Sequence, residues 1–165
     1  MRKIILVIND IRSTHNVGAL LRTADAMGVE KVIFSGYSPY PRIIGDSRLP
    51  HIINKLTKEI SKTALGAEVY IEFEYTDDIL ATLKELKKFN YSIISLEQSK
   101  KSIDINEFIP PNQCVLVIGN ELNGVDENIM NISDDIIEIP MLGKKESLNV
   151  ASATAIALHL MRYKN

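Results

Sequence analysis

The sequence predicts an α/β fold in which a parallel β-sheet is flanked by helices. Short blocks of nearly continuous apolar residues recur along the chain, a pattern typical of strands that are buried on both faces. Between these blocks lie segments in which apolar residues return every three or four positions, as on the buried side of a helix. The chain has 165 residues, 45% of them apolar and 24% charged, which fits a single globular domain spanning residues 1–165.

The predicted strands are the apolar blocks themselves. In chain order they are Ile4–Ile8, Lys31–Ser35, Glu68–Phe73, Tyr91–Leu96, Val115–Ile118 and Ile136–Ile139. The first block follows two basic residues, as in a signal peptide, but Asn9 and Asp10 interrupt it and no small-residue cleavage site follows, so a strand is favoured. The segment Gly36–Pro50 is the longest predicted loop, and loops of that length usually bind or cover a ligand.

The predicted helices are Asn16–Met27, Asp77–Phe89 and Leu148–Tyr163. Gly28 is expected to stop the first helix, because glycine readily adopts the conformation that ends one. The second helix starts with acidic residues and ends with lysines, which suits the helix dipole, and Asp77 or Asp78 is its expected cap. The third helix begins with small residues that let another backbone approach closely, and Ser147 is its expected N-cap.

Composition excludes several classes of protein. The net charge of −2 and the pI near 5.9 argue against a protein that holds nucleic acid by bulk charge. No apolar run reaches the ~18–20 residues of a membrane span, so no membrane association is expected. The single cysteine, Cys114, excludes a disulfide framework and fits a buried packing role in a reducing, cytoplasmic setting. The histidines lie far apart in sequence, so we expect no metal site.

The first polar motif, Asn16–Ala24, follows the first predicted strand. Gly18 is expected to let a ligand approach the N-terminus of the helix, which attracts anions. Arg22 can bind a phosphate through two parallel hydrogen bonds. The alternative is that Asn16 is only a helix cap and Arg22 only a solvated surface residue, and the spacing alone does not decide between the two.

Two further motifs follow later predicted strands. Gly119–Gly124 is neither a Walker loop, because no Lys-Ser or Lys-Thr follows it, nor a dinucleotide fingerprint, because the chain has no G-x-G-x-x-G. In the third motif, Ser147 and Asn149 frame Leu148, a spacing that can present backbone and side-chain groups to one ligand. The alternatives are a sharp strand-to-helix turn for the second motif and a simple helix cap for the third.

In this order, the three motifs resemble those of the TrmH/SpoU family of RNA ribose 2′-O-methyltransferases, within the SPOUT superfamily. The matching stretches are Asn16-x-Gly18-x3-Arg22-Thr23-Ala24, Ile118-Gly119-Asn120-Glu121 with Asn123-Gly124-Val125, Ile139-Pro140-Met141 with Ser147-Leu148-Asn149-Val150-Ala151, and Lys62–Glu68. The resemblance covers nearly the whole chain. One departure is Asn120, which stands where many members have a small residue such as serine.

The resemblance implies a SPOUT methyltransferase fold with a C-terminal deep trefoil knot. It implies S-adenosylmethionine as the cofactor and tRNA or rRNA as the substrate. It also implies a homodimer whose sites are completed across the interface. Many members also carry an N-terminal RNA-binding domain or basic flanking helices, and this chain is expected to depart from them as a single domain without such an extension. The implied cofactor-binding residues are Leu96, Gly119, Ile139, Met141, Ser147 and Leu148. The implied catalytic residues are Arg22, which acts at the target ribose, Asn16, which supports it, and Glu121, Ser147 and Asn149, which shape the site.

Two roles remain open for Arg22. Because arginine is normally always protonated, we expect it to bind the phosphate beside the target ribose and lower the pKa of the 2′-hydroxyl. It would act as a base only if its own pKa were strongly depressed. The basic residues expected to surround the site are Arg2, Lys3, Arg12, Arg22, Arg42, Arg48, Lys144 and Lys145.

Three rival functions are weighed against ribose methylation. A non-catalytic RNA-binding dimer of the same fold would keep the RNA surface but not the chemistry. A generic α/β nucleotide binder or structural dimer would bind no S-adenosylmethionine. Methylation of a base is also known in the superfamily, but the motif that pairs Asn16 with Arg22 favours the ribose.

Overall fold

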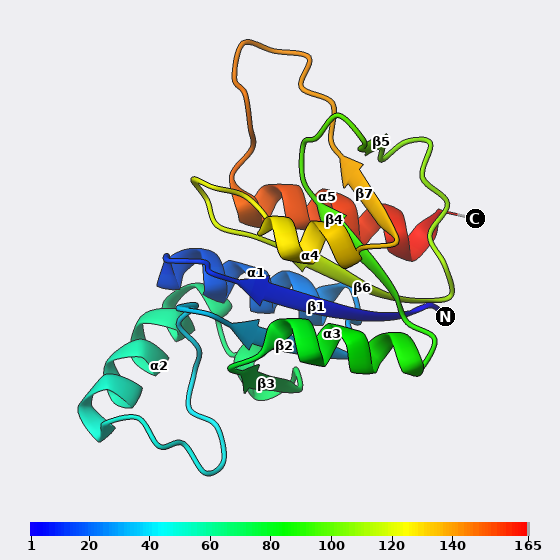
Figure 1. The fold of residues 1–165 in the computed structure, drawn as a ribbon. Helices are drawn as coiled ribbons and strands as arrows, with labels where there is room; N and C mark the ends of the chain where they lie inside the picture. Colours follow the sequence, from blue (N-terminus) through cyan, green and yellow to red (C-terminus); the bar gives the residue numbers. More distant parts are fainter. Residues whose placement is uncertain (165) are drawn as a thin grey trace.

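The computed structural model describes residues 1–164, which form one sheet of seven parallel strands (Figure 1). The strands lie in the order β3-β2-β1-β6-β4-β7-β5. Their bounds are β1 Lys3–Asn9, β2 Lys31–Ser35, β3 Phe73–Thr76, β4 Ser92–Leu96, β5 Ile103–Asp104, β6 Gln113–Ile118 and β7 Asp135–Glu138. The helices are α1 Thr14–Ala26, α2 Pro50–Ala64, α3 Ile79–Lys88, α4 Glu127–Ile132 and α5 Val150–Tyr163, with a short 3₁₀ helix at Ala67–Val69.

Helices cover both faces of the sheet, as the continuous apolar strands require. The side chains of β1 alternate between the two faces, so Ile4 and Leu6 pack with α1, α2 and α5, whereas Ile5 and Val7 pack with α3 and α4. The central strands β1 and β6 are therefore apolar on both sides. The predicted parallel sheet flanked by helices is confirmed.

Helix α5 is fastened to the far end of α1 by a buried arginine. Arg162 is only 8% exposed, and its guanidinium donates hydrogen bonds to the carbonyl oxygens of Met27 at 2.8 Å and Gly28 at 2.7 Å. It also donates to the carbonyl of Arg2 at the start of the chain. These bonds satisfy carbonyls at the C-terminus of α1 and fix how α5 lies across the sheet.

The third predicted strand, Glu68–Phe73, is wrong. After α2 the chain turns through Leu65 and Gly66, both left-handed, and continues as the 3₁₀ helix. Tyr70, 81% exposed, faces outward, and β3 pairs with β2 only from Phe73 onward. The apolar residues of this predicted strand thus belong mostly to the 3₁₀ helix and the turn that follows it. Helices α2 and α4 and the short strand β5 were not predicted, while β7 begins and ends one residue before its predicted bounds.

Candidate active site

The candidate site lies at the carboxyl ends of four adjacent strands, β1, β6, β4 and β7, where parallel sheets commonly bind ligands. A cavity of about 460 Å³ opens there. All six residues of the expected cofactor pocket line it, namely Leu96, Gly119, Ile139, Met141, Ser147 and Leu148, together with Glu121 and Asn149. The structure thus brings residues of the second and third motifs together with Leu96 at the end of β4. The roles assigned to them stay predictions.

A chain of hydrogen bonds joins Glu121, Asn16 and Asn149. The Asn16 side-chain nitrogen donates to Glu121 Oε1 at 3.1 Å, and the Asn149 side-chain nitrogen donates to Asn16 Oδ1 at 3.1 Å. One residue comes from each motif, so the bonds connect the start of α1, the loop after β6 and the start of α5. Asn16, with one amide group, donates to one neighbour and accepts from the other.

The carboxylate of Glu121 also receives backbone hydrogen bonds from the residues before α1. The N–H groups of Arg12 and Ser13 donate to it at 3.2 and 3.4 Å. Burial alone would raise the pKa of Glu121, but hydrogen bonds from its own backbone, from Asn16 and from these two N–H groups outweigh burial and lower the pKa. Glu121 is therefore ionised at neutral pH and holds the start of α1 against the loop after β6.

Asn149, and not Ser147, is the N-cap of α5. Its side-chain oxygen accepts hydrogen bonds from the N–H groups of Ala151 at 2.9 Å and Ser152 at 3.4 Å. The predicted cap at Ser147 is wrong because the chain stays non-helical until Val150, which leaves Ser147 exposed on the cavity rim. Asn149 consequently has two tasks: its oxygen starts the helix while its nitrogen binds Asn16.

Asn120 and Gly119 shape the loop after β6. Asn120 exchanges backbone hydrogen bonds of 2.9 Å with Gly124, and its buried side chain donates to the carbonyl of Asp10 at 2.9 Å. Its Oδ1 accepts from the backbone of Leu122 and Asn123. A Cβ on Gly119 would lie 2.2 Å from the Gly124 oxygen, so only glycine fits there. The asparagine that departs from the family pattern is thus a structural part of this loop.

Glu97 is a site residue that sequence reasoning missed. Its Oε2 accepts a 2.8 Å hydrogen bond from the backbone N–H of Val125, and it fills the space beside Gly124 that a side chain would occupy. Its neighbour Gln98 donates to the carbonyl of Glu146 at 2.9 Å and so ties the loop after β7 to the loop after β4. The available signal was an acid directly after the apolar block that ends at Leu96.

Of the expected catalytic residues, only Arg22 neither lines the cavity nor is hydrogen-bonded to a residue that does, within residues 1–164. It lies six residues after Asn16, about 9 Å further along the axis of α1, and it is exposed. Within residues 1–164 no hydrogen bond or ion pair links it to the residues that line the cavity. The helix itself begins at Thr14, and Ser13 is its cap, so Asn16 is not the cap that the alternative interpretation supposed.

Gly18 does not leave room for a ligand, which corrects the interpretation of the first motif. A Cβ there would lie 2.1 Å from Thr63 Oγ1 and 2.3 Å from the Ile60 carbonyl oxygen. The glycine therefore allows α1 to pack closely against α2. The expected ring of basic residues is also wrong in part, because Arg2 and Lys3 lie at the opposite end of β1 from the cavity.

No three histidine, cysteine, aspartate or glutamate side chains of residues 1–164 are grouped so as to hold a metal ion. In the same part of the chain, every helix is too short or too polar to traverse a lipid bilayer.

Residues 46–159 match the family described as the SpoU rRNA Methylase family. The chain is 31% identical over 158 residues to a tRNA (guanosine(18)-2'-O)-methyltransferase of Aquifex aeolicus, covering 96% of this chain and 68% of the relative. It is 33% identical over 155 residues to the 23S rRNA (guanosine-2'-O-)-methyltransferase RlmB of Neisseria meningitidis, covering 94% of this chain and 56% of the relative. The chain thus spans between about half and two thirds of these relatives.

Solved structures share the fold. The Aquifex aeolicus TrmH/SpoU tRNA modifying enzyme superposes with a TM-score of 0.80 at 28% identity, over 98% of this chain and 75% of the other. The AdoMet-bound rRNA methyltransferase of Sinorhizobium meliloti superposes with a TM-score of 0.81 at 21% identity, over 98% and 57%. At that identity the second likeness shows the fold alone.

Proposed function

Because the chain belongs to the SpoU rRNA Methylase family, we propose that it transfers a methyl group from S-adenosylmethionine to a ribose 2′-hydroxyl of tRNA or rRNA. The observation that carries this proposal is the hydrogen-bonded chain Glu121–Asn16–Asn149 at the rim of the cavity. It unites three motifs that are distant in sequence, beside the residues that would bind the cofactor.

The cavity suits S-adenosylmethionine in size and chemistry. Its volume of about 460 Å³ lies within the ~300–1,000 Å³ usual for ligand pockets. Leu96, Ile139 and Leu148 supply apolar wall for the adenine ring, and the carboxylates of Glu97 and Glu138 supply negative charge for a cationic ligand. When bound, the cofactor supplies an electrophilic methyl group on a positively charged sulfur.

The protein's own residues would align the ribose and activate its hydroxyl. Positioning alone can contribute several kcal/mol to such a transfer. Asn16 and Asn149 would fix the rim on which the RNA lies, and Glu121 would hold that rim to the cofactor loop. Arg22 would bind the phosphate next to the target ribose and favour the ionised 2′-oxygen electrostatically.

We further infer a homodimer in which Arg22 serves the site of the other subunit. Arg22 is exposed and, within residues 1–164, forms no hydrogen bond or ion pair with Glu121, Asn16 or Asn149, so it is available to a second copy. Helix α5, which packs beside α1, exposes Ile156 and Tyr163 on one stripe, apolar surface of the kind that interfaces cover. A symmetric pairing through this side would build each site from both chains.

The trefoil knot is also a proposal for this chain. The segment between β7 and α5 would pass through a loop of the chain, as the resemblance implies. The central place of β6, between β1 and β4, and the bond from Gln98 to Glu146 support a close crossing of these segments.

The function is tested by two measurements. Calorimetry with S-adenosylmethionine should show binding, and tritium from its methyl group should pass to bulk tRNA or rRNA. Nucleotide-resolved mapping of 2′-O-methylation in cells with and without the protein then identifies the target. Cofactor binding without transfer to any RNA would leave the non-catalytic RNA-binding dimer as the better description, and absence of cofactor binding would reject the proposal.

A further inference from the structure

A second cavity, of about 870 Å³, lies beside the candidate active site. It is bounded by the residues before α1, the loop of residues 36–49 between β2 and α2, helix α2 and the end of β3. We call it the tyrosine cleft, because its walls carry Tyr37, Tyr40 and Tyr75 together with Arg12 and Arg48. None of these residues belongs to the expected catalytic or cofactor-binding set, although Arg12 and Arg48 are among the basic residues expected around the site.

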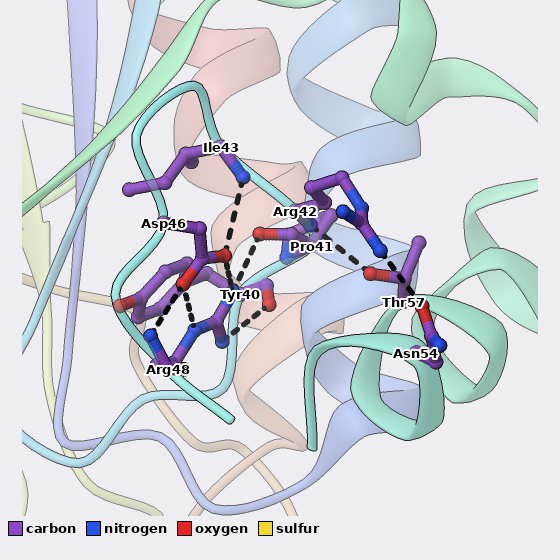
Figure 2. A network of polar contacts seen from close by, with 8 residues as sticks. All are labelled: Tyr40, Pro41, Arg42, Ile43, Asp46, Arg48, Asn54 and Thr57. Carbon is purple, nitrogen blue, oxygen red and sulfur yellow. Dashed lines mark hydrogen bonds and ion pairs between the residues drawn. The ribbon is translucent and has the colours of Figure 1, made fainter. Parts of the chain in front are cut away.

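The floor of the tyrosine cleft is a preformed stack. The Tyr40 and Tyr75 rings are stacked with centroids 4.7 Å apart, and the Arg48 guanidinium lies 3.5 Å from the centroid of the Tyr40 ring. Figure 2 shows Arg48 against this ring and its bonds to Asp46. The hydrogen bonds from Arg48 hold the pKa of Asp46 far below its usual range, so the pair stays ionised and fixed.

Further bonds hold the loop in one shape. Arg48 donates to the carbonyl oxygens of Tyr40 and Pro41 at 3.0 Å. Arg42 binds α2 through its backbone N–H, at 3.0 Å from Thr57 Oγ1, and through its guanidinium, at 2.8 Å from Asn54 Oδ1 (Figure 2). A loop with this many fixed contacts presents its side chains without first paying an ordering cost.

Tyr40, Tyr75 and Arg48 contact one another, whereas Tyr37 keeps much of its surface exposed to solvent. Its side chain is 53% exposed, and the Arg12 guanidinium lies 5.6 Å from its ring centroid. Its hydroxyl accepts a 2.6 Å hydrogen bond from Asn120, in the loop that lines the cofactor cavity. Arg12 is connected to the same loop, because its backbone N–H donates to Glu121. The cleft and the candidate active site thus share a wall.

We propose that the tyrosine cleft binds an unstacked nucleobase of the RNA, from a nucleotide that neighbours the one presented to the active site. This inference rests on the proposed function. An exposed tyrosine ring beside an arginine is the surface on which single-stranded RNA bases stack, and the arginine can bind the adjoining phosphate. The shared wall places such a base on the path of a strand that reaches Glu121.

The acidic lining of the cleft selects among bases. Glu59 and Asp77 also lie on its wall, and neither forms an ion pair within residues 1–164. Carboxylates that are not in ion pairs disfavour a phosphate beside them but accept hydrogen bonds from base N–H groups. Guanine offers an imino and an amino group side by side, which matches the two oxygens of one carboxylate. The cleft should therefore prefer guanine to uracil.

The test measures binding of a fluorescent single-stranded RNA of about twelve nucleotides, one guanosine among uridines, by anisotropy. Tyr37→Ala should weaken binding by roughly 5- to 100-fold, the range expected for loss of one stacked base. Tyr37→Phe, which keeps the ring and loses the bond to Asn120, should bind within about twofold of wild type. Tyr70→Ala removes a tyrosine that is more exposed, at 81%, and lies outside the cleft, so it should leave RNA binding unchanged.

The outcomes separate this proposal from the proposed function. Calorimetry with S-adenosylmethionine on each variant reports the cofactor cavity, which Tyr37→Ala should leave intact, and thermal melts report folding. If wild type binds RNA and cofactor but Tyr37→Ala binds RNA equally well, the subsite is overturned and the methyltransferase proposal stands. If wild type binds no RNA, the subsite is also overturned. An all-uridine RNA that binds wild type as tightly would overturn the preference for guanine, and Glu59→Gln with Asp77→Asn should abolish that preference.

Discussion

The side-chain nitrogen of Asn149 donates a 3.1 Å hydrogen bond to the side-chain oxygen of Asn16. The two residues come from opposite ends of the chain, and each begins or lies at the beginning of a helix that borders the cavity. Because Asn149 also caps α5, the position of that helix and the geometry of the site depend on the same amide group.

Replacing Asn149 with alanine should lower both stability and activity. Loss of the cap is expected to reduce the free energy of unfolding by about 1 kcal/mol. Loss of the hydrogen bond to Asn16 as well would bring the total to about 2 kcal/mol. Urea denaturation measures this change. Ser147→Ala is the matched control, because Ser147 is exposed and does not cap the helix, and it should shift stability by less than about 0.5 kcal/mol. Equal effects of the two variants would contradict the assignment of the cap.

Arg22→Ala should reduce methyl transfer by roughly 100-fold or more while leaving cofactor binding and stability unchanged. Transfer should fall because the phosphate beside the target ribose loses its arginine. Cofactor binding and stability should stay unchanged because Arg22 is exposed and does not line the cavity of its own chain. Transfer of labelled methyl groups to RNA measures the loss.

Mixed dimers test whether Arg22 acts across the interface. Inactive Arg22→Ala and Asn149→Ala subunits, unfolded together and refolded in equal amounts, should recover about a quarter of the wild-type rate if each site draws on both chains. Half of the dimers are then mixed, and each mixed dimer has one intact site. No recovery would place Arg22 in the site of its own chain.

Gly18→Ala should destabilise the protein by about 1–3 kcal/mol, because its Cβ would overlap Thr63 and the backbone of α2. Chemical denaturation monitors the change. Gly143→Ala is a suitable control, since a Cβ there meets no atom within 4 Å and the residue is not left-handed. A neutral Gly18→Ala would mean that α1 and α2 do not pack as closely as described.

Glu121 should make stability depend on pH in the acidic range. The pKa of Glu121 is lower in the folded protein than in the unfolded chain. Its ionised form therefore stabilises the fold fully above the unfolded pKa, and this stabilisation is lost as the pH falls through the lowered folded pKa. Glu121→Gln should thus destabilise the protein more at pH 7 than at pH 3. Glu107→Gln, at an exposed position away from the cavity, should show no such difference.

Cys114 should be unreactive in the folded protein. Burial raises the pKa of its thiol to about 11, so almost no thiolate exists at pH 8 and none is accessible. A chromogenic disulfide reagent should react with the thiol in guanidinium chloride but not under native conditions. Rapid native labelling would show that β6 opens far more readily than a central strand should.

The elements that sequence reasoning predicted well are those with a strong local pattern. β1 and β2 are apolar blocks that are buried throughout most of their length, and α1 and α3 show clear helical spacing. Helix α2 escaped prediction because its buried residues, Ile53, Ile60 and Ala64, are few among polar ones and because it directly follows a long loop.

Most residues of the site could be predicted from the sequence, but the hydrogen bonds between them could not. The motifs and the family they resemble identified the six expected cofactor-pocket residues that line the cavity, but they missed Glu97 and included Arg22, which does not line it. The bond from Asn16 to Glu121 depends on β1 lying next to β6, a neighbour relation that no local pattern encodes. Tyr37 and Glu97 were missed for the same reason, since their partners are distant in sequence.

The central place of β6 has a consequence for how the chain folds. Lys3 pairs with Gln113, so β1 can acquire one of its two neighbours only after most of the chain has been synthesised. Such distant pairings make folding slow, on the order of milliseconds to seconds. Until β6 arrives, the isoleucine-rich edge of β1 stays unpaired and open to other chains. The nascent protein should therefore aggregate more readily than the finished one, and its yield should depend on chaperones and on the rate of translation.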